Sequence, residues 1–158
     1  MFRELTRKNK KLSHEECIEI LKNTRHGVLS VIGDGDYPYG TPMNHYYNEQ
    51  EGKLYFHCGQ GGHRLDAILQ NPKGSFCAYD EGKQEEGHWA LRFKSVIVFG
   101  KVTVITDPER IIDITTKLSR KFTSDESYIQ SEIKAHVHRT LLLELTPEHI
   151  SGKAVTES

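Results

Sequence analysis

Apolar positions gather in several short runs rich in β-branched, aromatic and small residues, a pattern typical of strands. Polar and glycine-rich turns separate these runs at hairpin spacing. We therefore expect a mainly antiparallel sheet that closes into a barrel or pairs with another chain. Pro38 and Pro42 restrict the second run to an edge or bulged strand, because proline has no N–H to donate. The predicted strands cover residues 26–32, 37–47, 53–57, 73–79, 93–106 and 139–145.

Three stretches carry helical signals instead. Ser13 and Glu16 form a capping-box pattern ahead of an apolar stripe. Another apolar side runs through 63–70 and stops before Pro72, and a third helix begins at Asp107-Pro108, where proline suits the first turn. The predicted helices run from the Ser13 cap to Thr24, over 63–70, and from Asp107 to about Phe122.

These elements predict an α+β fold that is mainly β, with two or three peripheral helices. The chain of 158 residues fits one domain, 1–158, with a basic N-terminal arm at 1–11 and a tail at 154–158. We expect 80–88 to form a mobile loop and 123–131 a long loop or frayed helix, because both stretches are polar.

Charge and composition narrow the range of functions. With 21 Lys and Arg against 22 Asp and Glu, the chain has no overall field to attract nucleic acid or an anionic membrane. No apolar stretch approaches the ~20 residues that span a bilayer, and no signal region follows the basic start, so a cytoplasmic protein is expected. Cys17, Cys58 and Cys77 are odd in number and widely spaced, which favours reduced thiols over disulfides.

The segment with the clearest chemical content is YFHCGQGGHRLDAI, residues 55–68. A strand ends there, a glycine-rich turn follows, and a helix opens with His63 and Arg64. Glycines let backbone N–H groups approach an anion, a helix start adds unpaired donors, and Arg64 adds a guanidinium fork. The segment thus predicts a phosphate cradle. A plain structural turn with a surface arginine explains the same residues equally well.

Four segments taken in order resemble the pyridoxamine 5′-phosphate oxidase-like flavoproteins, and within them the nitroimidazole-resistance branch. The resemblance covers roughly Leu12 to Lys153. The segments are YPYGTPMNHYY at 37–47, YFHCGQGGHRLDAI at 55–68, KSVIVFGKV at 94–102 and ISGK at 150–153.

This resemblance implies an FMN-binding split β-barrel that acts as a homodimer, with FMN in a cleft between the two subunits. The strand carrying Pro42, Met43 and Asn44 would pass along the flavin ring, and His57 and Cys58 would lie beside the ring and its ribityl chain. His63 and Arg64 match the basic pair that holds the phosphate. Ser95 would bond the ring edge, and Lys153 would reach the phosphate from the last strand.

The function implied is that of a flavin-dependent reductase. Reduced nicotinamide, NAD(P)H, would supply electrons for a small-molecule acceptor such as a nitroaromatic or a quinone. His57 is the candidate catalytic residue, as a proton donor or substrate contact. The chain ends ISGKAV and lacks the Arg- and His-bearing strand of the true vitamin B6 oxidases, so that activity is not expected.

Several alternatives stay open at this level. The protein could bind or store flavin without turnover, use a deazaflavin, or bind haem with His57 or His63 as axial ligand. His136 and His138 would share one face if 136–138 were a strand, but no carboxylate or cysteine stands at a recognised metal-site spacing, so we expect no metal. Trp89 would either stack at the active-site mouth or anchor its own loop.

Overall fold

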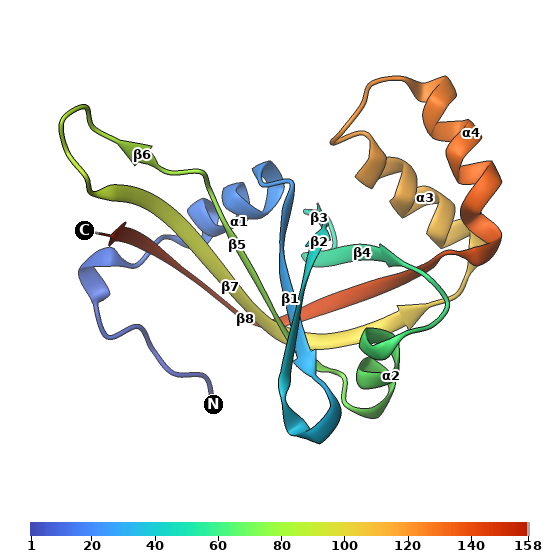
Figure 1. The fold of residues 1–158 in the computed structure, drawn as a ribbon, viewed down its shortest axis with the longest axis horizontal. Coiled ribbons are helices and arrows are strands. Elements are labelled where there is room, and N and C mark those ends of the chain that lie inside the picture. The colour runs from blue at the N-terminus through green and yellow to red at the C-terminus, as the bar shows by residue number, and fades with distance from the viewer. Residues whose placement is uncertain (158) are drawn as a thin grey trace.

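The computed structural model describes residues 1–157 and shows a strongly curled antiparallel sheet flanked by helices (Figure 1). Seven strands are hydrogen-bonded in the order β2-β1-β5-β7-β8-β4-β3, and the short β6 pairs with β7. The strands are β1 His26–Ile32, β2 Pro38–Asn44, β3 Tyr46–Asn48, β4 Lys53–Cys58, β5 Lys73–Tyr79, β6 Lys83–Gln84, β7 Leu91–Ile105 and β8 Leu141–Glu157. The predicted mainly β, split-barrel architecture is confirmed.

Four α-helices lie around this sheet in residues 1–157, one more than the sequence predicted. Ser13 and Glu16 make both bonds of the expected capping box, at 3.1 and 2.9 Å. The helices are α1 His14–Asn23, α2 His63–Gln70, α3 Pro108–Ser119 and α4 Glu126–His136, with short 3₁₀ turns at Lys8–Lys10, Asp34–Asp36 and Val137–Arg139. None of these helices is long and apolar enough to cross a membrane.

The barrel closes at His45. The run 37–47, predicted as one strand, is divided at His45 into the two strands β2 and β3. These strands lie at opposite edges of the sheet. One residue can join the two edges only because the sheet curls until they meet. The His45 ring is fully buried at this joint, with Nε2 2.7 Å from the Leu21 carbonyl oxygen. Lys121 Nζ also donates to the His45 carbonyl oxygen, at 2.6 Å.

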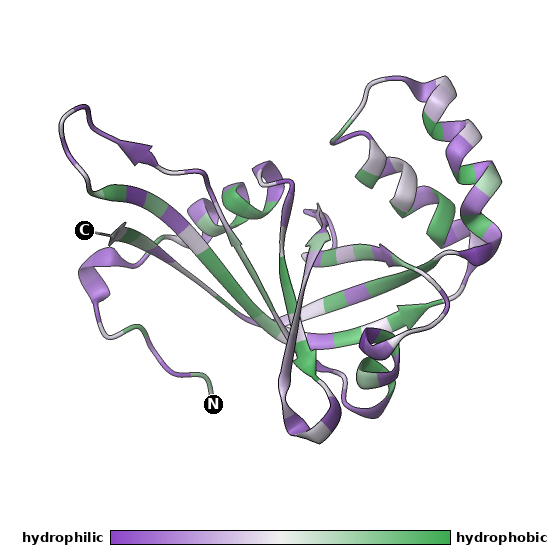
Figure 2. Ribbon diagram, in the orientation of Figure 1, coloured by the Kyte–Doolittle hydropathy of each residue, from purple (hydrophilic) through white to green (hydrophobic). Residues whose placement is uncertain are grey.

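The main core fills the inside of the curl. Alternate residues of the strands point inward, and the strands are largely hydrophobic along the middle of the sheet (Figure 2). Phe56 and Phe76 meet there edge to face with ring centroids 5.1 Å apart. A second cluster of Tyr55, Ile111, Ile114 and Leu142 lies on the other side of β4 and attaches α3.

Several expectations for loops and ends are wrong. Of the two alternatives for 123–131, the long loop is wrong: the Asp125 side chain accepts from the Tyr128 N–H at 3.0 Å and caps a regular helix, α4, which begins at Glu126 and runs past this stretch to His136. Residues 136–138 end that helix and form a 3₁₀ turn, so they are not a strand. Lys83 and Gln84, inside the expected 80–88 loop, pair with β7. Residues 154–157, expected as a tail, continue β8 because they pair with Leu91–Lys94.

Candidate functional site

The glycine-rich turn before α2 faces open space. A Cβ added at Gly59, Gly61 or Gly62 would meet no atom within 4 Å, so packing does not explain these glycines. Gly62 has φ +109°, which disfavours other residues, and no side chain caps the helix that it precedes. The first N–H groups of α2 are therefore left for an outside acceptor, which is the geometry of an anion cradle.

Arg64 supplies the charge at this cradle. Its NH1 donates to Thr41 Oγ1 at 3.2 Å, which ties the start of α2 to the edge strand β2. Within residues 1–157 no carboxylate forms an ion pair with Arg64. A half-buried guanidinium with spare donors fits a phosphate, which accepts several charge-assisted hydrogen bonds.

His63 points elsewhere. Its Nε2 accepts from the Asp34 N–H at 3.1 Å and lies 3.6 Å from the Asp34 carboxylate, and its ring packs 4.2 Å from that of Tyr39. These contacts hold the ring on the turn between β1 and β2. His63 and Arg64 therefore point to different partners within one chain, His63 toward Asp34 and Tyr39 and Arg64 toward Thr41.

His57 and Cys58 are neighbours on β4 but lie on opposite sides of it. Cys58 packs against the main core, whereas His57 shares the face of Tyr55, toward α3. Burial, and then the nearby Arg64 charge, lower the pKa of His57, so the imidazole is neutral at neutral pH. Burial raises the pKa of the Cys58 thiol, which argues against a reactive thiolate.

His57 opens into a pocket of about 330 Å³ between β4 and the α3–α4 pair. We call this space the helical pocket. The sequence does not predict this pocket, because it assigns 123–131 only to a long loop or frayed helix; Ile129 and Ile133, four residues apart, are the helical signal that it offers. Its lining is His57, Ile111, Thr115, Ser119, Phe122, Thr123, Tyr128, Ile129, Glu132, Ile133, His136, Val137 and Thr140.

The helical pocket and the cradle adjoin each other. Gln60, inside the glycine turn, donates from Nε2 to the His138 carbonyl oxygen at 3.0 Å. His138 belongs to the 3₁₀ turn that follows α4, and Val137 and Thr140 on either side of it line the pocket. His57 and Arg64 thus stand at the border between a cationic cradle and a largely apolar pocket.

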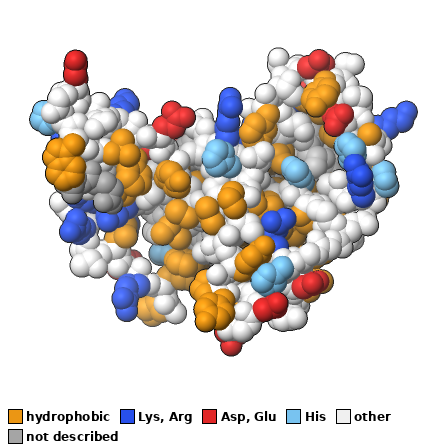
Figure 3. Space-filling view, viewed as in Figure 1, with side chains coloured by type: hydrophobic (Ala, Val, Ile, Leu, Met, Phe, Trp, Pro, Cys, Tyr) orange, Lys and Arg blue, Asp and Glu red, His pale blue; other side chains and the backbone are white. Residues whose placement is uncertain are grey.

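The remaining predicted cofactor residues lie on the sheet. Met43 points into the core with 8% of its surface exposed. Pro42, Asn44, Ser95 and Lys153 lie on the outer face, where Ser95 and Lys153 are direct cross-strand partners. The outer face also exposes 39% of both Ile97 and Phe99. Figure 3 shows hydrophobic side chains gathered over the central strands of one face of the molecule.

One chain does not bring all these residues together. His57 pairs with Leu142 at one end of β8, whereas Ser95 pairs with Lys153 near its other end. At ~3.3 Å per residue the two positions are roughly 36 Å apart along the strand. Trp89 exposes 77% of its surface, so it does not anchor its loop within the chain.

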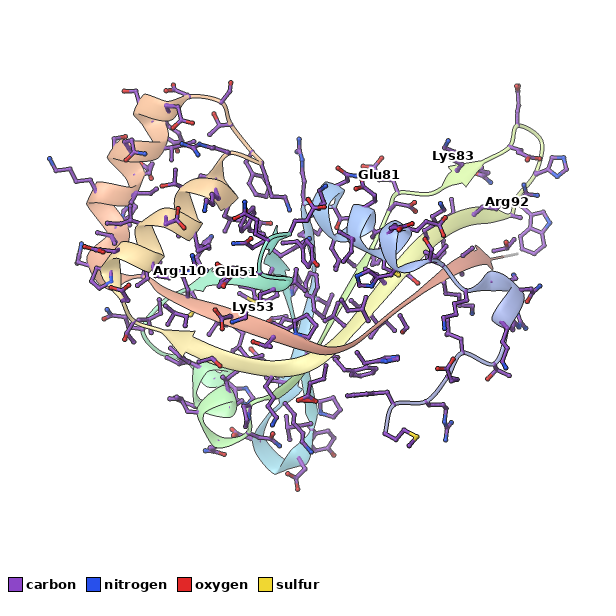
Figure 4. The ribbon with its side chains drawn as sticks, turned by 180° about the vertical axis from the view of Figure 1, so that it is seen from behind. Glu51, Lys53, Glu81, Lys83, Arg92 and Arg110 are labelled. Atoms are coloured by element: carbon purple, nitrogen blue, oxygen red, sulfur yellow. The ribbon has the colours of Figure 1, made fainter. Side chains whose placement is uncertain are left out.

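A charged network attaches α3 to the sheet beside the site (Figure 4). The Tyr55 hydroxyl lies between the carboxylates of Glu51 and, at 2.7 Å, Glu144, to which it offers its single proton, and it accepts from Arg110 of α3 at 2.8 Å. Lys53 pairs with Glu144 at 2.9 Å. Burial and the two carboxylates raise the pKa of Tyr55, so it stays a neutral donor. The network positions one wall of the helical pocket.

The cysteines and the histidines after β4 can also be placed. All three cysteines are free. Residues 1–157 contain no cluster of three or more His, Cys, Asp or Glu side chains placed to hold a metal ion. His136 Nδ1 accepts from Arg139 at 2.6 Å and its Nε2 lies 3.5 Å from Glu132, so this ring has protein partners already.

Comparison with known families identifies the chain. The pyridoxamine 5′-phosphate oxidase family matches residues 13–154. The protein belongs to this family. The match covers nearly the whole barrel and both borders of the site, from the capping box of α1 to Ala154 in β8. No curated protein matches the chain in sequence.

Solved structures share the fold. A protein of Bacteroides thetaiotaomicron assigned to 5-nitroimidazole antibiotic resistance is 19% identical, with a TM-score of 0.78, over 92% of this chain and 87% of that one. A FAD-binding protein of Mesorhizobium loti is 22% identical, with a TM-score of 0.66, over 92% and 97%. A FAD and heme binding protein of Mycobacterium smegmatis is 18% identical, with a TM-score of 0.72, over 92% and 73%. At these identities the likeness establishes the split-barrel fold.

Proposed function

We propose that the protein is a flavin-dependent oxidoreductase that binds FMN and passes electrons from NAD(P)H to a small nitroaromatic or quinone. The observation that carries the proposal is the cradle. Arg64 lacks an acidic partner among residues 1–157, and it stands at an uncapped helix start behind three glycines that face open space. The family membership and the flavin-binding proteins of the same fold support flavin as the occupant.

The donor set suits FMN specifically at its phosphate end. A single arginine and the α2 N–H groups match one terminal phosphate. When bound, the flavin would supply two-electron chemistry, taking hydride from the reduced nicotinamide and reducing the acceptor. A quinone then takes up two electrons and two protons, one of them drawn from solvent. His57, neutral and adjacent to Arg64, is placed to contact the acceptor and to relay that proton.

A second copy of the chain would complete the site. Pro42, Asn44, Ser95 and Lys153 lie on an outer face that also exposes Ile97 and Phe99, and they are far from His57 within one chain. A homodimer that buries this face would bring them to the partner's cradle, so that FMN lies between the subunits. Equilibrium sedimentation with and without FMN tests this part directly.

The cradle is tested by titrating FMN into the purified protein and following flavin fluorescence. Arg64→Ala should weaken FMN binding by about 1–3 kcal/mol, because it removes a charge-assisted contact to the phosphate. Arg7→Ala, which removes the same charge from an exposed position in the N-terminal arm, should leave the affinity unchanged. Riboflavin, which lacks the phosphate, should bind both proteins alike.

Turnover is a separate measurement. Bleaching of the flavin band by NADH or NADPH, followed by reoxidation with a quinone or nitroimidazole under anaerobic conditions, supports a reductase. Bound flavin that no nicotinamide bleaches would make the protein a flavin store, and a Soret band would mean haem. Equal FMN affinity in the wild type and Arg64→Ala would remove the basis of the assignment.

A further inference from the structure

The helical pocket differs from the cradle in every property that selects a ligand. The cradle presents a guanidinium and free N–H groups. The pocket wall includes no lysine or arginine, and Ile111, Phe122, Ile129, Ile133 and Val137 give it an apolar interior. Its charge-bearing side chains are Glu132 and two histidines. The arginines behind this wall already have partners, since Arg139 donates to His136 and Arg25 lies over the Phe122 ring. With Glu132 in the wall and no lysine or arginine in it, the pocket selects against phosphates and carboxylates.

The pocket is also built differently from the barrel. Ile129 is the one buried residue of α4, and its neighbour on the same helical face, Ile133, is only half-buried. The close packing partners of α4 are α3 and the 3₁₀ turn after it, so the helix arches over β4 instead of resting on it. Apolar side chains left facing a hollow of about 330 Å³ are typical of a ligand site, since volumes near this size suit small molecules.

Polar groups at fixed places would orient such a ligand. The Tyr128 ring stands at the rim with 56% of its surface exposed. Glu132 and His136, one helical turn apart, face each other at 3.5 Å beside it. His57 of β4 is the pocket residue that borders the cradle, because β4 ends at Cys58 and the glycine turn of the cradle follows directly. A ring held in the pocket would therefore lie against the side of the site where the proposed FMN is held.

We propose that the helical pocket is the acceptor subsite, and that it takes a neutral aromatic ring such as an uncharged quinone while rejecting anionic analogues of the same ring. The role of the pocket as an acceptor site rests on the proposed function, but binding of the neutral ring does not require flavin. Ile133 lines the pocket from α4, and the exposed Tyr128 ring lies at its opening.

The test uses two probes with the same ring system: menadione, which is neutral, and 1,4-naphthoquinone-2-sulfonate, which is anionic. Binding to the whole protein is measured by calorimetry, first without FMN and then with it. The expected result is that menadione binds in both conditions and the sulfonate binds at least tenfold more weakly. Equal binding of the two probes, or no binding of menadione, would overturn the proposal.

A filled-pocket variant locates the binding. Ile133→Trp should weaken menadione binding at least tenfold and raise the KM for menadione, with FMN affinity and bleaching by NAD(P)H unchanged. Lys134→Trp is the matched control, because the same ring is added to the exposed neighbour on α4, and it should bind menadione like the wild type. Unchanged menadione binding in Ile133→Trp places the acceptor elsewhere even if FMN binds. If the wild-type protein does not bind FMN, the proposed function is wrong instead.

Discussion

The two sides of β4 show how this small protein separates stability from ligand binding. On one side, Leu54 and Phe56 enter a sealed core and have no exposed surface. On the other side, Tyr55 and His57 face α3 and α4, where a packed patch gives way to an open pocket. Adjacent residues of one strand thus serve different ends, because side chains alternate across a sheet. The sealed side should dominate stability, and the open side should dominate binding.

The largest effect should come from the sealed side. Phe76→Ala removes a fully buried ring that packs against Phe56 and His45. We expect a loss of about 3–5 kcal/mol in the free energy of unfolding, since transfer and cavity terms add. Urea unfolding followed by circular dichroism measures it. A loss below about 1 kcal/mol would mean that the core is not close-packed there.

A smaller effect should appear at the joint that closes the barrel. Burial, and then the charge of Lys121, lower the pKa of His45 to about 3. As the pH falls from about 6.5 toward 3, the unfolded chain takes up a proton that the folded chain refuses. The contribution of neutral His45 to the free energy of unfolding is therefore fully present above about pH 6.5. It is lost on acidification, by at most about 1.4 kcal/mol per pH unit.

His45→Gln keeps a donor for the Leu21 carbonyl oxygen and removes this titration. The gap in unfolding free energy between wild type and variant at pH 7 should therefore narrow at pH 5.5 and again at pH 4.5. Urea unfolding at the three pH values measures the gap. Parallel pH profiles would contradict the neutral, buried state of His45.

A substitution at the border between the two sides of β4 should lower the free energy of unfolding by less. Tyr55→Phe removes the hydroxyl that links Glu51, Glu144 and Arg110, and we expect a loss of about 1–2 kcal/mol. Hydrogen exchange should rise in α3, to which Arg110 belongs, more than in β5 and β7. A uniform rise over the whole sheet would show that the network supports the barrel rather than the helix.

The smallest effect should come from the open side. Ile133→Ala removes apolar atoms that already face a hollow, so the free energy of unfolding should fall by less than about 1 kcal/mol. Lys134→Ala, on the exposed face of the same helix, should change it by less than about 0.5 kcal/mol. A loss at Ile133 as large as that at Phe76 would mean that the pocket is closed in solution.

Much of the fold was predictable because it depends on local chemistry. Ser13 and Glu16 cap a helix through their own side chains, and the alternation in β1, β5 and β7 reports which face of each strand is buried. α4 was predicted only as a long loop or frayed helix over 123–131, because that stretch is polar and Ile129 and Ile133 alone give a weak apolar stripe. The cradle was visible for the same local reason, since the glycine turn and Arg64 are close in sequence.

The sequence by itself determined most of the strands, the capped starts of α1 and α3 and the cradle motif, because neighbouring residues produce these features. Only the tertiary structure decided that the chain crosses from one sheet edge to the other at His45, that His57 and Cys58 serve opposite faces, and that α4 stands over His57. These outcomes depend on pairings between residues far apart in the chain. Curvature of the sheet and packing of helices against it set those pairings, and no local pattern records them.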